Sequence, residues 1–363
     1  MVELADIFRL HGPQYRAKFG ARMLPSHRRA MQDIEQCRTA ALGGQVYLCK
    51  PCDEKRYSYH SCKNRHCPKC GNEQANEWLD QQQQLLLPVP HFLVTFTLPA
   101  ELRALARSHQ KTVYHLLFRA SSAALMKLAQ DPRFVGGQIG MVGVLQTWTR
   151  DLRYHPHVHY LVPGGGLSND RRWRSSRADF LVHEKPLALI FRAKLRDALK
   201  QAGLLAGVDQ RVWKKDWVVD CEPVGSGAAA FKYLAPYIFR VALSNKRILK
   251  LADGADGEVT FQYKESATQQ LKTCSLPAEK FMGRFLQHVL PPRFVKVRYY
   301  GLLSPSNRHL LQRARLLLGA RRRADQTTAQ ATVGKQTADL RCLKCGSVLL
   351  LVETLPRHSR APP

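Results

Sequence analysis

Residues 155–163 read HPHVHYLVP, a stretch in which three histidines occupy alternate positions. Branched and aromatic residues that end at a proline are typical of a β-strand. Side chains two residues apart on a strand share a face and lie about 7 Å from each other, so His157 and His159 can converge on one divalent ion. The bulky Val158 between them is expected to point into the core. The stretch therefore predicts a core strand that carries a metal site.

The third ligand of this ion has to come from another position, because three histidines in line on one strand cannot easily all bind one ion. Gln146 and Asp151 are candidates because they lie close by in the sequence. His155, the remaining histidine of the stretch, is a third candidate. The residues alone leave these three open.

Further strands and helices are predicted on both sides of this stretch. We expect strands at 91–99, 140–148 and 217–221, helices at 101–130, 187–202 and 228–243, and a hairpin with two Asp-Gly pairs at 250–264. This order of elements indicates an α+β fold, in which helices cover an antiparallel sheet.

The composition changes near residues 88 and 304, which predicts three parts in a chain of 363 residues. Residues 1–88, which contain six cysteines interleaved with basic residues, are expected to form a small zinc-binding domain that recognises DNA. Residues 89–303 would form the main α+β domain. Residues 304–363 would be a basic tail that ends in a Cys-x-x-Cys pair.

Six of the ten cysteines lie between Cys37 and Cys70. Two Cys-x-x-Cys pairs at this separation are typical of a structural zinc site, since four thiolates leave no open position for catalysis. The two pairs are expected to share one ion, and the remaining cysteines with one histidine would complete a second site. The candidate ligands are Cys49, Cys52, Cys67 and Cys70 for the first site and Cys37, Cys62 and His60 or His66 for the second.

Cys342 and Cys345 form a further Cys-x-x-Cys pair, which is only half of a zinc site. It could find ligands elsewhere in the chain, such as His358, or join the metal of another chain. A turn without metal is an equally good interpretation. Cys221 and Cys274 are isolated and are expected to be structural.

The chain has 56 lysines and arginines against 28 aspartates and glutamates, a formal net charge of +28. Such a charge opposes compaction unless a polyanion neutralises it, which favours nucleic acid as a partner. No run approaches the roughly 20 apolar residues of a membrane span, and the start lacks the pattern of a signal peptide. We therefore expect a protein of the reducing cytoplasm. The candidate DNA-binding residues are Lys63, Arg65, Lys69, Lys232, Arg240, Lys246 and Arg247.

Tyr233 and Tyr237 stand four residues apart, on one face of the predicted helix, with Pro236 between them. Beside a histidine metal site this pair gains a chemical interpretation. A divalent ion can polarise a scissile phosphate, and a phenolic oxygen can then attack in line. Lys232 or Arg240 would stabilise the developing charge, because tyrosine has an ordinary pKa near 10. The product would be a 5′-phosphotyrosine and a free 3′-hydroxyl.

The combination resembles the IS91 family of bacterial transposases, the HUH-type group with two tyrosines. Four blocks carry the resemblance: CRTAALGGQVYLCKPCDEKRYSYHSCKNRHCPKC, VLQTWTRDLRYHPHVHYLVPGGG, WVVDCEPVGSGAAAFKYLAPYIFRVALSNKRI and FMGRFLQHVLPPRFVKVRYYGLLSPSNR. The resemblance implies a zinc-binding domain followed by an HUH nuclease domain with an RRM- or palm-like antiparallel sheet. It also implies rolling-circle transposition through single-stranded DNA.

Residue by residue, the resemblance puts His157 and His159 on the catalytic metal pair, which would take Mg²⁺ or Mn²⁺. Tyr233 and Tyr237 fall on the two nucleophiles. Cys49, Cys52, Cys67 and Cys70 fall on the zinc positions. Gln146 departs from the histidine that is expected there in many relatives.

Two other interpretations of the sequence stay open. A replication initiator or a relaxase would use the same HUH chemistry. A non-catalytic zinc protein that binds single-stranded nucleic acid would share the charge and the cysteines, but would not need the histidine strand and the tyrosine pair. The sequence contains no Gly-x4-Gly-Lys-Ser/Thr loop, so ATP is not expected as a cofactor and unwinding would come from host replication machinery.

Overall fold

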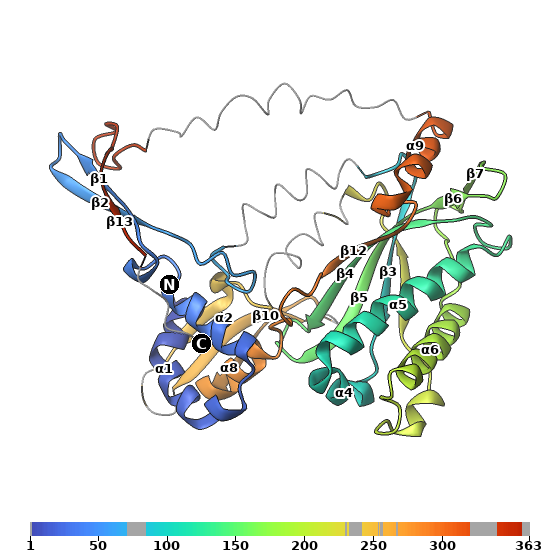
Figure 1. The fold of residues 1–363 in the computed structure, drawn as a ribbon, viewed down its shortest axis with the longest axis horizontal. Helices are drawn as coiled ribbons and strands as arrows, with labels where there is room; N and C mark the ends of the chain where they lie inside the picture. Colours follow the sequence, from blue (N-terminus) through green and yellow to red (C-terminus); the bar gives the residue numbers. More distant parts are fainter. Residues whose placement is uncertain are drawn as a thin grey trace.

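The computed structural model describes residues 2–70, 85–228, 231, 242–252, 254, 257–265, 268–319 and 340–357 (Figure 1). A central sheet with its covering helices forms one body, and a second body gathers the first helices with later strands. The predicted mixture of helices and antiparallel sheets is confirmed. In the part of the chain described, no helix is both long and apolar enough to span a membrane.

The central sheet has five strands in the order β12-β4-β5-β3-β8, and every neighbouring pair is antiparallel. Three of the four strands that the sequence predicts lie in the middle of this sheet, and the fourth lies at one edge. The strands are β3 (His91–Thr97), β4 (Gly140–Trp148), β5 (Tyr154–Pro163), β8 (Val219–Pro223) and β12 (Val297–Gly301). The last of these was not predicted as a strand.

Three helices cover one face of this sheet: α4 (Arg103–Ser108), α5 (Gln110–Ala129) and α6 (Glu184–Gln201) (Figure 1). Alternate residues of β5 point into the core beneath them, among them Val158 and Tyr160. The Tyr160 hydroxyl lies 2.8 Å from Ser121 Oγ, and its ring occupies the space that a side chain on Gly143 would fill. Because strand residues alternate, the histidines of β5 must face the opposite side.

That opposite face carries a smaller cluster of buried side chains, which includes Val142, Leu161 and Phe231. Leu302, Leu303 and residues of α9 (Arg308–Leu317) belong to the same cluster. A two-stranded ribbon, β6 (Gly165–Leu167) with β7 (Trp173–Ser175), extends from the end of β5. This face is therefore partly covered by this smaller cluster.

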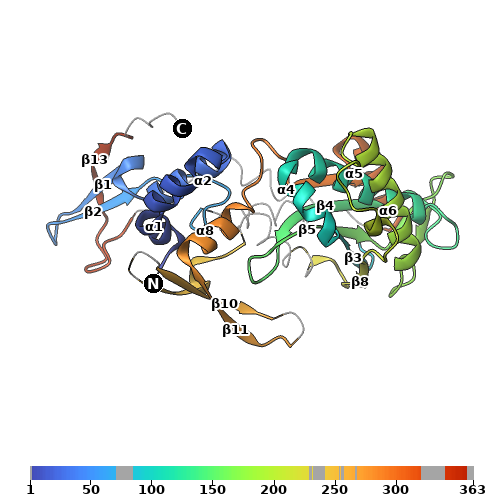
Figure 2. The same cartoon turned by 90° about the horizontal axis from the view of Figure 1, so that it is seen from below.

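The second body packs α1 (Leu4–Phe19) and α2 (Pro25–Gln36) with α8 (Ala278–Leu286) (Figure 2). A sheet in the order β11-β10-β9 completes its core, and Phe8 meets Phe285 edge-to-face with ring centroids 5.6 Å apart. The strands are β9 (Ile248–Leu251), β10 (Glu258–Lys264) and β11 (Leu271–Pro277). The predicted hairpin corresponds to β9 and β10. Residues 248–286 thus share a core with the N-terminal helices, while the predicted domain limits near 88 and 304 stay predictions.

A third sheet, in the order β13-β1-β2, joins the two ends of the chain. β1 (Gly44–Cys49) and β2 (Glu54–Tyr59) form a hairpin, and β13 (Leu350–Leu355) adds to β1 antiparallel. Short 3₁₀ helices complete the described structure: Gly20–Arg22, Ala40–Leu42, Ala100–Leu102, Gln210–Trp213, Asn245–Arg247 and Pro305–Asn307. The C-terminal residues expected to be a tail therefore contribute a strand to the N-terminal hairpin.

Candidate active site and metal centres

His157, His159 and Gln146 meet on the face of the central sheet that α4, α5 and α6 do not cover. Gln146 of β4 is the register partner of His157, and its Oε1 lies 3.2 Å from Nε2 of His159. The two imidazole rings lie 4.7 Å apart between centroids. Each of the three residues is only 8% exposed. One amide oxygen and two imidazoles are thus gathered in a small buried space.

Hydrogen bonds fix how both imidazoles are turned. Nδ1 of His157 donates to the carbonyl of His155 at 2.7 Å, which leaves the lone pair of Nε2 free. Nδ1 of His159 lies 2.9 Å from the hydroxyl of Thr95 on β3. The amide nitrogen of Gln146 donates to the Trp148 carbonyl at 3.2 Å, so the amide oxygen turns toward the histidines. Such outer contacts are what hold metal ligands in place.

Burial keeps both imidazoles in the neutral form that binds metals. Desolvation lowers the pKa of His157 well below its usual value, and the nearby His159 adds to this shift. Desolvation also lowers the pKa of His159 to about 4. The donor set of two neutral nitrogens and one amide oxygen fits a divalent cation with open coordination positions.

The other two candidates for a third ligand have different partners in the structure. His155 Nδ1 accepts a hydrogen bond from the Arg103 guanidinium at 2.6 Å. The carboxylate of Asp151 forms an ion pair with Arg153 at 2.7 Å. Geometry therefore favours Gln146. The sequence did not point to Thr95, because its position beside His159 depends on the register of β3 against β5.

Tyr233, Tyr237, Lys232 and Arg240 lie outside the described residues. The described neighbour of this segment is Phe231, which is 1% exposed and belongs to the cluster of Leu161. Leu161 follows His159 by two residues and so shares its face of β5. The chain reaches Phe231 from β8 through a turn at Gly225 and Gly227, whose φ angles are 64° and 76°.

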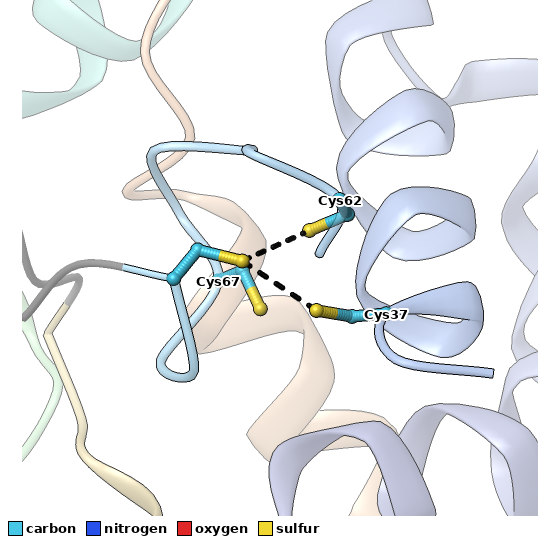
Figure 3. A group of neighbouring side chains, drawn as sticks. Cys37, Cys62 and Cys67 are labelled. Carbon is cyan, nitrogen blue, oxygen red and sulfur yellow. Dashed lines mark hydrogen bonds between the residues drawn. The ribbon is translucent and has the colours of Figure 1, made fainter. Parts of the chain in front are cut away.

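Eight cysteines form two groups of four, and in each group the sulfur atoms all lie within 4.8 Å of one another. Figure 3 shows sulfur atoms of the first group turned toward each other, with Cys37 coming from the end of α2. In this group Cys70 Sγ lies 3.5 Å from Cys37 Sγ and 3.6 Å from Cys62 Sγ. Four thiolates at a Zn–S distance of about 2.3 Å stand about 3.8 Å apart, so the spacing fits tetrahedral zinc. The first group is Cys37, Cys62, Cys67 and Cys70, and the second is Cys49, Cys52, Cys342 and Cys345.

The predicted sharing of one ion by Cys49, Cys52, Cys67 and Cys70 is therefore wrong. The register of the β1–β2 hairpin gives the reason: Gly44 pairs with Tyr59 at its base, and Cys49 pairs with Glu54 at its tip. Five residue steps separate tip from base by about 17 Å, which keeps the first Cys-x-x-Cys pair away from the second.

Neither candidate histidine belongs to a cysteine group. His66 is buried, and its Nε2 accepts a hydrogen bond from the backbone N–H of Leu290 at 3.3 Å. His60 is exposed at the end of β2. The predicted mixed site of cysteines and one histidine is thus replaced by a group of cysteines alone.

Three of the candidate DNA-binding residues have partners within the protein. The Arg65 guanidinium donates to the carbonyls of Phe294 at 2.7 Å and Pro291 at 2.9 Å. Arg247 donates to the carbonyls of Gln262, Ala242 and Arg150, and Lys69 forms an ion pair with Glu3. Lys63 and Lys246 are exposed. Arg65 and Arg247 therefore have a structural role, because each guanidinium joins backbone carbonyls of other segments.

We expect Arg65→Met to lower stability more than DNA affinity. Losing two charge-assisted hydrogen bonds to the segment before β12 should cost about 1–3 kcal/mol, seen as a fall of several degrees in the apparent Tm. The matched variant Lys63→Met, which removes an exposed charge from the same loop, should leave the Tm unchanged and weaken DNA binding modestly. Thermal melts and binding to a single-stranded oligonucleotide measure both. Equal changes in Tm and in DNA affinity for the two variants would contradict the structural role of Arg65.

Two protein families match parts of this chain. A family described as "Putative transposase" matches residues 140–310, which contain β4, β5 and β12. A transposase zinc-binding domain of the IS91 type matches residues 7–98. "Putative transposase y4qJ" of Sinorhizobium fredii is 38% identical over 87% of this chain and 84% of its own length.

The chain belongs to the IS91 family of transposases. The transposase for insertion sequence element IS801 of Pseudomonas savastanoi pv. phaseolicola is 26% identical over 74% of this chain and 68% of its own length. A solved structure of the conjugative relaxase TrwC in complex with mutant OriT DNA matches 30% of this transposase and 44% of that chain. Its TM-score is 0.25 and its sequence identity 16%. The zinc-binding domain of this transposase contains the first cysteine group, which supports a structural Zn²⁺ there.

Proposed function

We propose that this transposase nicks and rejoins single-stranded DNA at the ends of its element through 5′-phosphotyrosine intermediates, in rolling-circle transposition. The observation that carries the proposal is the convergence of two neutral, oriented imidazoles and one amide oxygen on the sheet face opposite α4, α5 and α6. This is the HUH nuclease chemistry that the sequence predicts.

His157, His159 and Gln146 would hold the divalent ion, Mg²⁺ or Mn²⁺. When bound, it would polarise the scissile phosphate and neutralise charge as that charge develops. Thr95 and the His155 carbonyl, which hydrogen-bond to the imidazoles, would keep them turned toward the ion. Burial of all three ligands excludes bulk water, which strengthens the electrostatic contribution.

Tyr233 and Tyr237 would be the nucleophiles. A phenolic oxygen loses its proton and forms a bond to phosphorus, the bond from phosphorus to the 3′-oxygen breaks, and that oxygen takes up a proton. Attack by another 3′-hydroxyl reverses the reaction and joins strands without ATP. Two tyrosines allow two covalent strands to be handled in one event. The position of Phe231 in the Leu161 cluster supports an approach of this segment to the histidine face.

The charge of +28 supports a single-stranded backbone as partner, at element ends and at the target. Lys232, Arg240, Lys246 and Lys63 are the proposed contacts, and affinity should fall steeply with salt. Host replication would supply the unwinding, in the cytoplasm at the nucleoid.

The test is formation of a covalent adduct. The full chain is incubated with a single-stranded oligonucleotide that carries an element end and with Mg²⁺ or Mn²⁺, and the products are separated under denaturing conditions. We expect a protein–DNA adduct that the double variant Tyr233→Phe/Tyr237→Phe does not form. Tyr57→Phe, which changes an exposed tyrosine on β2, is the matched control and should form it normally.

An adduct that persists in the double variant would refute the nucleophile assignment. Absence of any adduct with the wild type on all end sequences would refute the enzyme hypothesis and favour a non-catalytic nucleic-acid-binding protein. A replication initiator or relaxase would form the same adduct, and membership of the IS91 family favours the transposase.

A further inference from the structure

The second cysteine group joins the two ends of the chain. Cys49 Sγ lies 3.5 Å from Cys345 Sγ, and Cys52 Sγ lies 4.0 Å from Cys342 Sγ. A disulfide would need about 2.05 Å, whereas sulfurs that share a tetrahedral zinc stand about 3.8 Å apart. Cys342 and Cys345 lie outside the residues that match the zinc-binding domain. The group is therefore a site with half of its ligands beyond that domain.

Both halves of the group have the backbone of a zinc knuckle. Cys49 and Cys52 stand at the tip of the β1–β2 hairpin, and the next residue, Asp53, has a φ of 52°. Cys342 and Cys345 are followed by Gly346 with a φ of 72°. The second knuckle closes a hairpin of its own, in which the N–H of Cys342 donates to the Ser347 carbonyl at 2.8 Å.

Apart from the cysteines, this C-terminal segment is held mainly by the backbone pairing of β13 with β1. Residues 350–354 of β13 are all exposed, with Leu351 at 53%, so burial of apolar side chains contributes little. The buried part is a small cluster of Cys49, Cys342 and Leu349. An ion pair joins Lys344 to Glu54 across the two knuckles, but solvent screens an exposed pair, so it adds little stability. If pairing with β1 were its only support, β13 would be a weakly held edge strand of this sheet.

We propose that a second structural Zn²⁺ binds Cys49, Cys52, Cys342 and Cys345 and fixes residues 340–357 to the N-terminal hairpin. Both ends of the chain then form one zinc ribbon, and the C-terminal strand is part of the zinc-binding module. The proposal does not depend on the cleavage chemistry, because none of the four thiols lies on the central sheet.

Zinc content of the full chain tests the proposal. All proteins carry His157→Ala and His159→Ala, so that the sheet site adds no zinc, and are purified under reducing conditions. We expect two zinc ions per chain in this background. Cys342→Ser/Cys345→Ser should retain one, and the matched control Cys221→Ser/Cys274→Ser, which changes the two cysteines outside both groups, should retain two.

A rescue variant separates loss of the ligand from loss of the fold. Cys345 is exposed, so Cys345→His can supply an imidazole to the same ion. It should keep two zinc ions, whereas Cys345→Ser should bind the second ion much more weakly. A single zinc ion in the parent, or no change in Cys342→Ser/Cys345→Ser, would overturn the proposal.

Attachment of the C-terminal segment gives a second measurement. With a protease site engineered into residues 325–335, the cleaved fragment should co-elute with the rest of the chain and separate after chelation of zinc. Separation of the fragment from the zinc-loaded protein would equally overturn the proposal.

Discussion

Replacing His157 and His159 together by alanine is expected to slow single-strand cleavage by at least about 10³-fold. The pair supplies two of the three converging donors, and Gln146 alone cannot hold a divalent ion. The sheet should keep its fold, because the face that packs against α5 and α6 is made by the alternate residues of β5, such as Val158 and Tyr160. DNA binding in the presence of a chelator should stay close to that of the wild type.

Single-turnover cleavage of a labelled oligonucleotide measures the first expectation, and fluorescence anisotropy in EDTA measures the second. His155→Ala is the matched control, since this histidine is on the same strand but pairs with Arg103. It should reduce the rate far less than the double variant. Gln146→Leu should raise the Mn²⁺ concentration needed for half-maximal cleavage. Cleavage by the double variant at the wild-type rate would show that the ion binds elsewhere.

The strands and the metal face could be predicted because period-two patterns are local. HPHVHYLVP places His157 and His159 on one face whatever surrounds the strand, and β5 runs from Tyr154 to Pro163 as expected. The choice of Gln146 and the support from Thr95 depend on the registers of β4 and β3 against β5. Registers are long-range properties that patterns in one stretch do not encode.

The zinc ligands show even more clearly that a local sequence pattern does not predict long-range contacts. Spacing identified the Cys-x-x-Cys pairs, but it paired Cys52 with Cys67 across a hairpin whose tip and base are far apart. The partner of the first pair is Cys342 with Cys345, almost the whole chain away, and sequence distance gave no reason to join them. Likewise β12 and β13 are short strands that form only against partners distant in the sequence.

The largest effect on stability is expected from Cys67→Ala in the first cysteine group. Cys67 is 1% exposed and lies in the cluster that joins α1 and α2 to α8 and the β9–β11 sheet. Structural zinc contributes about 10–16 kcal/mol to the folding of small zinc peptides, while a domain is stable by only about 5–15 kcal/mol. Loss of this ion should therefore unfold the N-terminal module rather than merely loosen it.

Hydrogen exchange resolves this expectation by segment. Amides of α1 and α2 should lose protection in Cys67→Ala, while those of α5 beneath the central sheet should keep it, because α5 packs in a separate core. Cys345→Ser is the matched control: it removes a ligand of the other group and should leave α1 and α2 protected. Some loss of amide protection is also expected in the segment before β12, since Arg65 and His66 from the Cys62–Cys67 loop hydrogen-bond to its backbone. Full protection of α1 in Cys67→Ala would contradict a zinc-dependent core.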